Sequence, residues 1–109
     1  MYGPTAITVI VDRMLRYPHA VAFSPRTNHL VVTNSGANYF CVYAPTRGFR
    51  GVRWSRSAVA RIPFCPDDVF EQTNSSNEME GGPKGVAMHD NTLAVCGAEF
   101  GIKIYSFKE

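Results

Sequence analysis

Six residues placed at the ends of apolar segments carry side chains that could bind a polar or anionic ligand. They are His19, Asn34, Asn38, Lys84, Glu99 and Phe100. Together they supply an imidazole, two amides, an amine, a carboxylate and an aromatic ring, and a mixture of this kind lines concave ligand pockets. The alternative is structural: the imidazole and the amine would be solvated at the surface, and the amides would bond backbone groups of their own turns. These residues form a site only if the fold gathers them.

A second group combines positive charge with aromatic rings. Arginines recur between positions 47 and 61 with two aromatic residues among them: Arg47, Arg50, Arg53, Arg56, Arg61, Phe49 and Trp54. Guanidinium groups and aromatic rings can grip phosphates or stack on bases and sugars. The alternative is an outer hairpin whose arginines face water and whose Trp54 packs between sheets. A formal net charge of +2 is too small to indicate nucleic acid, so we expect Trp54 to contact a glycan or another polar ligand.

Catalysis has little support in the sequence. It contains neither a Gly-x-Ser-x-Gly motif nor a glycine loop that could cradle phosphate. Cys41, Cys65 and Cys96 have no Cys-x-x-Cys spacing, so neither a zinc site nor a disulfide framework is indicated. Calcium prefers about six to eight oxygen ligands, and Glu99 has no partner carboxylate in the expected site. We therefore expect no catalytic residue, no metal ligand and no cofactor, with calcium as the alternative.

Short segments rich in β-branched and aromatic residues predict an all-β protein of a single domain. An isolated strand is expected at 5–11, followed by a first unit at 17–63 whose outer strand lies within 54–62. The segment 47–53 is expected to be a glycine-containing loop. An inserted loop at 63–82, with at most one helical turn at 67–72, precedes a second unit at 83–107.

The second unit repeats the first. The aligned pairs are Pro18 with Pro83, Val21 with Val86, Phe23 with Met88, Leu30 with Leu93, Val32 with Val95, and Val42 with Ile104. Self-similarity of this kind indicates a propeller, a solenoid or a repeat array, in which no unit buries its apolar face alone.

The repeated strings resemble the β-propeller repeats of the NHL-repeat and lactonase-like type. Their units run from a Pro-x-(Gly/Ala)-Val-Ala-Phe strand through a Leu-x-Val strand and an Asn-Ser-Gly turn to a Val-Tyr strand, as at 18–43 here. The resemblance covers roughly two thirds of the chain and implies two four-stranded antiparallel blades. Lactonase-type propellers hold a divalent cation with acidic and amide side chains, for which Glu99 and Asn34 are the residues offered here.

In such blades the link into the first strand and the turn between the second and third strands lie on one rim. The resemblance therefore gathers on one rim His19, Asn34, Asn38, Lys84, Glu99 and Phe100. We expect an oligomeric binding module that recognises a polar or anionic ligand, such as a glycan, at this rim. The alternatives are a fragment of a lactonase or hydrolase-like propeller and a structural scaffold for protein–protein interaction.

Two blades cannot close a ring, because propellers have about four to eight blades. A cyclic homo-oligomer solves this problem if strand 5–11 of one subunit pairs with strand 102–107 of its neighbour. Three subunits would give six blades, so we expect a trimer. The competing interpretation is that the chain is a piece of a longer propeller.

Composition limits the classes of protein to which the chain can belong. The chain has 109 residues, of which 45% are hydrophobic and 18% charged, as in a globular domain. No apolar run approaches the roughly 20 residues of a membrane span, and residues 5–11 lack the basic segment and cleavage site of a signal peptide. We therefore expect a cytoplasmic protein with no membrane partner and no nucleic-acid partner.

Overall fold

The computed structural model describes residues 7–48, 51–74, 79–98 and 100–107. Within these ranges the chain forms strands β1 (Pro18–Phe23), β2 (Leu30–Asn34), β3 (Tyr39–Tyr43), β4 (Pro45–Gly48), β5 (Gly51–Trp54), β6 (Ala60–Pro63), β7 (Pro83–His89), β8 (Thr92–Gly97) and β9 (Gly101–Ser106), and one helix, α1 (Asp67–Asn74). The prediction of an all-β protein is confirmed at the level of fold class.

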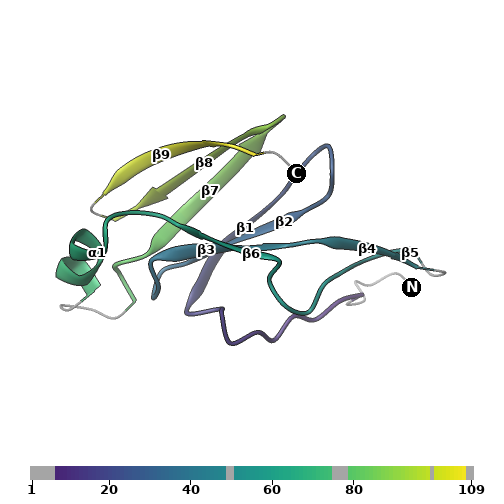
Figure 1. Cartoon of the computed structure of the whole chain (residues 1–109), viewed down its shortest axis with the longest axis horizontal. Helices are drawn as coiled ribbons and strands as arrows, with labels where there is room; N and C mark the ends of the chain where they lie inside the picture. Colours follow the sequence, from purple (N-terminus) through teal and green to yellow (C-terminus); the bar gives the residue numbers. More distant parts are fainter. Residues whose placement is uncertain (1–6, 49–50, 75–78, 99, 108–109) are drawn as a thin grey trace, which may run out of the picture.

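The strands form two main antiparallel sheets. The first sheet has the order β1-β2-β3-β6, and the second sheet has the order β7-β8-β9. The hairpin β4–β5 is inserted between β3 and β6 and pairs only with itself among the described residues. Figure 1 shows the two sheets side by side, with α1 at one end of the long axis and the β4–β5 hairpin at the other.

The second sheet repeats the register of the first. Val21 lies opposite Val32 in the first sheet, and Val86 lies opposite Val95 in the second. The pairs Phe23 with Leu30 and Met88 with Leu93 correspond in the same way. Residues aligned by the sequence repeat therefore occupy equivalent positions in the two sheets.

One face of each sheet contributes to a shared core. Val31, Phe40 and Val42 from the first sheet pack with Leu93 and Val95 from the second. All of them are 5% exposed or less. Burial of such side chains stabilises a fold by about 1.5–3 kcal/mol each, so the contact between the two sheets is the main apolar core of the described structure.

A hydroxyl hydrogen bond and a close backbone approach join β2 and the turn after it to the start of β7. Thr33 Oγ1 in β2 donates to the Lys84 carbonyl oxygen in β7 at 2.6 Å. Gly82 N donates to the Ser35 carbonyl oxygen at 2.9 Å, and a Cβ at position 82 would lie 2.0 Å from the Asn34 carbonyl oxygen. Position 82 therefore has no room for a side chain.

Two local predictions are wrong, and a third, the outer strand at 54–62, is right in part. Residues 7–11 form no strand, whereas residues 5 and 6 lie outside the described residues. Residues 47–48 and 51–53 of the predicted loop lie instead in the paired strands β4 and β5, with Gly51 at a φ of 101° at the start of β5. The outer strand expected within 54–62 is limited to β6, because the preceding residues leave the hairpin and turn back toward β3.

The inserted segment 63–82 contains a helix of eight residues, α1, in place of a single turn. Asp67 and Asp68 lie in its first turn, where negative charge is stabilised by the helix dipole. Its apolar residues, Val69 and Phe70, pack against the core while partly exposed, and two adjacent residues do not make the apolar stripe that would have predicted a helix. No helix among the described residues is long and apolar enough to cross a membrane.

Replacing Phe40 with Ala should destabilise the protein strongly, because this ring is 1% exposed between the sheets. We expect a loss of about 3–5 kcal/mol in the free energy of unfolding, measured by urea denaturation. The matched control is Phe23→Ala, at a side chain that is 53% exposed in one copy; for it, at a dilution where the chain is a monomer, we expect a loss of about 1 kcal/mol. Equal losses in the two variants would contradict this assignment of the core.

Candidate functional site

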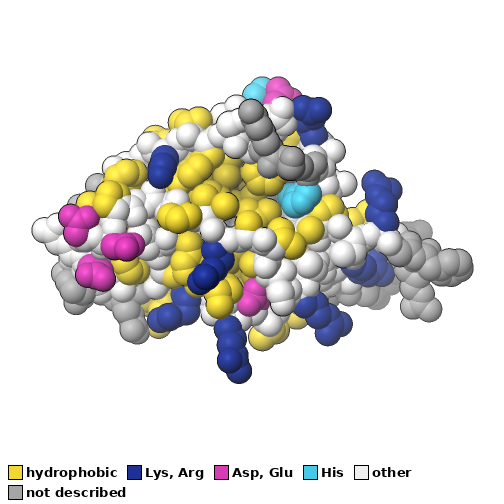
Figure 2. All heavy atoms as spheres, viewed as in Figure 1, with side chains coloured by type: hydrophobic (Ala, Val, Ile, Leu, Met, Phe, Trp, Pro, Cys, Tyr) yellow, Lys and Arg dark blue, Asp and Glu magenta, His cyan; other side chains and the backbone are white. Residues whose placement is uncertain are grey.

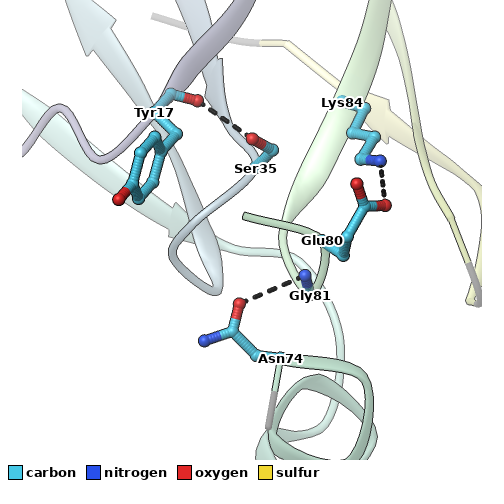
Figure 3. A network of polar contacts seen from close by, with 6 residues as sticks. All are labelled: Tyr17, Ser35, Asn74, Glu80, Gly81 and Lys84. Atoms are coloured by element: carbon cyan, nitrogen blue, oxygen red, sulfur yellow. Dashed lines mark hydrogen bonds and ion pairs between the residues drawn. The ribbon is translucent and has the colours of Figure 1, made fainter. Parts of the chain in front are cut away.

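Polar contacts join three connecting segments at the end of the sheets where the rim is predicted. Ser35 Oγ donates to the Tyr17 carbonyl oxygen at 3.2 Å, and Gly81 N donates to Asn74 Oδ1 at 3.2 Å. Figure 3 shows these two contacts beside the side chains of Glu80 and Lys84. The turn after β2, the link into β1 and the link into β7 therefore lie close to one another.

The two rim amides hold the chain together. Asn34 is fully buried; its Oδ1 accepts from Arg16 N at 2.9 Å, and its Nδ2 donates to the Tyr39 carbonyl oxygen at 3.3 Å. Asn38 Nδ2 donates to the Cys65 carbonyl oxygen at 2.7 Å and to Asp67 Oδ1 at 2.9 Å. These amides hold turns and the start of α1 in place. This role is the structural alternative to ligand binding that the sequence left open.

The other rim residues differ in their surroundings. Lys84 Nζ forms an ion pair with Glu80, and His19 is exposed on β1. Phe100 is 39% exposed, and its ring lies 5.4 Å from that of Phe64. Glu99 lies outside the described residues. A ligand role for these residues stays a prediction.

Trp54 lies away from the rim. Its Nε1 donates to the Asn28 carbonyl oxygen at 2.7 Å, and its ring lies 5.4 Å from that of Phe23. Both partners belong to the β1–β2 hairpin near its turn, whereas Asn34 lies at the opposite end of β2. The structure therefore does not place Trp54 in one site with His19 and Asn34.

Two of the thiols, those of Cys41 and Cys65, are in surroundings that disfavour a nucleophile. Cys41 and Cys65 are buried, and burial raises the pKa of both thiols, so the thiolate form is disfavoured at neutral pH. Within the part of the chain that is described, no three His, Cys, Asp or Glu side chains gather closely enough to hold a metal ion. The expectations about catalysis and cofactors stay predictions.

The clearest unsatisfied surface is the outer edge of the second sheet. β9 pairs with β8 on one side, and the described residues supply no strand on its other side. Ile102 and Ile104 in β9 are 72% and 62% exposed. An unpaired strand edge with apolar side chains is a template for pairing with another chain.

Apolar surface is also exposed where the sheets separate. A groove of about 300 Å³ lies between β3 and β6 of the first sheet and β8 and β9 of the second. Figure 2 shows hydrophobic side chains gathered across the middle of this face. The first strands of the two sheets, β1 and β7, are in contact. The sheets therefore diverge from these inner strands toward β6 and β9, the outer strands.

The N-terminal segment is fixed to the first sheet by Asp12. Its Oδ2 accepts from Tyr43 Oη at 2.9 Å and from Ala58 N at 3.0 Å, and its Oδ1 accepts from Met14 N at 3.1 Å. The hydrogen bond from Met14 is the largest cause that holds the pKa of Asp12 below its ordinary value, although burial opposes it. Burial and the bond to Asp12 raise the pKa of Tyr43. We call these contacts the Asp12 clamp.

Residues 7–11, before the clamp, are mostly exposed, although Ile10 packs against the buried cluster of Val32, Cys41 and Tyr43. Ile7, Val9 and Val11 are 54%, 68% and 90% exposed, and Thr8 and Ile10 between them are half-buried. Thr8 Oγ1 is buried without a hydrogen-bond partner in the described structure, which costs about 1–3 kcal/mol. The segment borders an apolar groove of about 480 Å³ on the outer face of the first sheet.

Sequence analysis missed the Asp12 clamp and the Lys84–Glu80 ion pair. The Asp-x-Met spacing is a local signal, since an aspartate side chain often bonds the backbone two residues on. The bonds to Tyr43 and Ala58 span 31 and 46 residues, so no short motif reveals them.

Replacing Asp12 with Asn should destabilise the fold and change its response to acid. The pKa of Asp12 lies below its ordinary value of 3.8, so the folded state binds this proton less readily than the unfolded state. The charged carboxylate therefore stabilises the fold above about pH 4, and this contribution is lost as the pH falls toward the lower folded pKa. At pH 7 we expect a loss of about 1–2 kcal/mol.

The test is urea unfolding of both proteins at several pH values. The difference in unfolding free energy should be largest near neutral pH and should narrow below about pH 4. Asp90→Asn is the matched control, because Asp90 is exposed and approaches only His89, at 3.5 Å. A difference for Asp12→Asn that stays constant between pH 7 and pH 3 would rule out the charged clamp.

No protein-family model, curated protein or solved structure matches the chain. Its function therefore has to be inferred from its own surfaces. The features that require an explanation are the open edge of β9 and the poorly held residues 7–11.

Proposed function

We propose that the two sheets are blades of a β-propeller and that the chain is a protein-interaction module, which accepts an extended strand along β9. The observation that carries this proposal is the difference between the two sheets. In the first sheet β6 pairs with β3, with Phe40 opposite Ile62 and Val42 opposite Ala60. β9 holds the position of β3 in the second sheet, where the described residues supply no equivalent of β6.

The strand arrangement supports the interpretation as blades. Both sheets are antiparallel meanders that begin with an inner strand, and these inner strands, β1 and β7, lie against each other. Thr33 links them, because its Oγ1 accepts from Ala20 N at 3.1 Å and donates to the Lys84 carbonyl oxygen. Propellers place four-stranded sheets around a central axis in this way.

Addition of a strand would satisfy two needs of the second sheet. It would pair the free backbone groups of β9, which is how strand addition to a sheet edge gives affinity. It would also help to cover Ile102 and Ile104, and burial of an isoleucine side chain contributes about 1.5–3 kcal/mol. The bound strand would therefore gain both hydrogen bonds and apolar contacts.

Ligand recognition at the rim has weaker support. The side-chain amides of Asn34 and Asn38 bond groups of the chain itself, and Lys84 is paired with Glu80. A glycan would have to displace these contacts or rely on His19 and its neighbours. The scaffold interpretation needs no such displacement, so we favour it over a lectin or a hydrolase.

Strand acceptance can be tested without knowing the natural partner. The probe is a peptide of alternating threonine and valine with lysines at both ends, added to the labelled chain at a dilution where light scattering gives a monomer. We expect saturable binding by fluorescence anisotropy. We also expect slower hydrogen exchange of backbone amides in residues 101–106, because their free edge becomes paired.

The control is the same peptide with the backbone N–H groups of one edge methylated. It keeps the side chains but cannot complete the ladder, so it should bind weakly and leave exchange in residues 101–106 unchanged. Equal binding of both peptides would show that contact with side chains alone explains the result. Absence of binding by either peptide would overturn the proposed function.

A further inference from the structure

We infer that the strand accepted along β9 is residues 7–11 of a second copy of this chain, and that the copies pack head to tail. In this contact the outer face of the second sheet covers the outer face of the first sheet in the next copy. The inference rests on the proposed function, since it names the partner that the open edge of β9 accepts.

The internal repeat supplies the template for this contact. In the first sheet, Phe40 and Val42 of β3 face the second sheet and are 1% and 5% exposed. Ile102 and Ile104 occupy the equivalent positions in β9 and are 72% and 62% exposed. The second sheet therefore presents to solvent the face that the first sheet uses for packing. A further sheet placed against it would repeat the contact already made within the chain.

The receiving face lies on the first sheet. Val95 of β8 is fully buried because the first sheet covers it. Val32 of β2 is its equivalent in the repeat, and it lies on the opposite face of the first sheet from the shared core. This face carries the apolar groove of about 480 Å³, lined by Val21, Phe23, Leu30, Val32 and Trp54 among others. It is where the second sheet of a neighbouring copy would pack.

The same neighbour can take the strand. Residues 7–11 border this groove, and the Asp12 clamp fixes the chain immediately after them. A second sheet that packs into the groove brings its own β9 to the same place. The segment is rich in β-branched residues, has alternating exposure and pairs with no strand of the described residues. If the segment moved from the groove to β9, the Thr8 hydroxyl would no longer be buried without a hydrogen-bond partner.

The contact is heterologous, because it joins one face of a copy to a different face of the next. Such contacts either close into a ring or continue as a fibre. With two sheets per copy, three copies give six blades, which is within the range of about four to eight found in propellers. The expected assembly is a closed trimer.

The experiment is light scattering on a size-exclusion column for the whole chain and for two proline variants. Wild type should give three times the 12.1 kDa of the chain. Successive N–H groups of a strand point to opposite sides, so either Thr8→Pro or Val9→Pro removes a donor that faces β9. At least one of the two variants should fall threefold in mass and remain folded, because residues 7–11 belong to no ladder within one copy.

Arg13→Pro is the matched control. Arg13 follows Asp12 in a turn closed by Leu15 N donating to the Asp12 carbonyl oxygen at 3.0 Å, and proline suits this position of a turn. This variant should keep the mass of wild type. A wild-type monomer, or an oligomer that both proline variants leave intact, would overturn the inference. If a wild-type monomer still binds the threonine–valine peptide, the proposed function stands and only the partner is wrong; if it binds no peptide, both fail.

Discussion

The constraint on which this structure depends is that every sheet has two faces and two edges, and the chain covers only some of them. The face of the first sheet that carries Val31, Phe40 and Val42 is buried against Leu93 and Val95 of the second. The opposite face of the first sheet is covered in part by the clamped N-terminal segment. Within the described residues, the outer face of the second sheet and the edge of β9 are uncovered. Exposed apolar surface is therefore a direct consequence of building a protein from two repeated sheets.

The contacts of the N-terminal segment divide it into a fixed part and a poorly held part. Asp12 and the residues that follow it bond to Tyr43, Ala58 and Tyr39, so they belong to the first sheet whatever else is bound. Residues 7–11 are anchored mainly by Ile10, are otherwise largely exposed, and leave Thr8 Oγ1 without a partner in the described structure. A division of this kind suits exchange of a short strand, because the exchanged part can move while the rest of the fold stays intact.

The repeat could be predicted from the sequence because its signals are local. Strands β1, β2, β7 and β8 are indicated by apolar segments bounded by residues that favour turns. The aligned valines take equivalent places in the two sheets. Helix α1 has only the adjacent apolar residues Val69 and Phe70, and so no periodic apolar pattern. The strand expected at 5–11 has the right residue types but no partner strand within the described chain. Residue propensity alone therefore predicted a strand that residues 7–11 do not form.

The candidate rim stays a prediction. Ser35 contacts Tyr17 and Gly82, so the turn after β2 lies close to the links into β1 and β7. The use of each side chain depends on distant partners: Asn38 bonds Cys65, which is 27 residues away. Trp54 was misplaced because the β4–β5 hairpin turns its ring toward Asn28 and Phe23. Residue type indicated which side chains could bind a ligand, and only the fold shows which of them are already engaged.

The most direct measurement of the central claim is isotope-filtered NMR on a sample mixed from labelled and unlabelled copies. It detects only contacts between protons of different copies. The account predicts such contacts between residues 7–11 of one copy and Ile102 and Ile104 of another. Contacts of residues 7–11 that occur only within the same copy, with none reaching β9 of a neighbour, would contradict it.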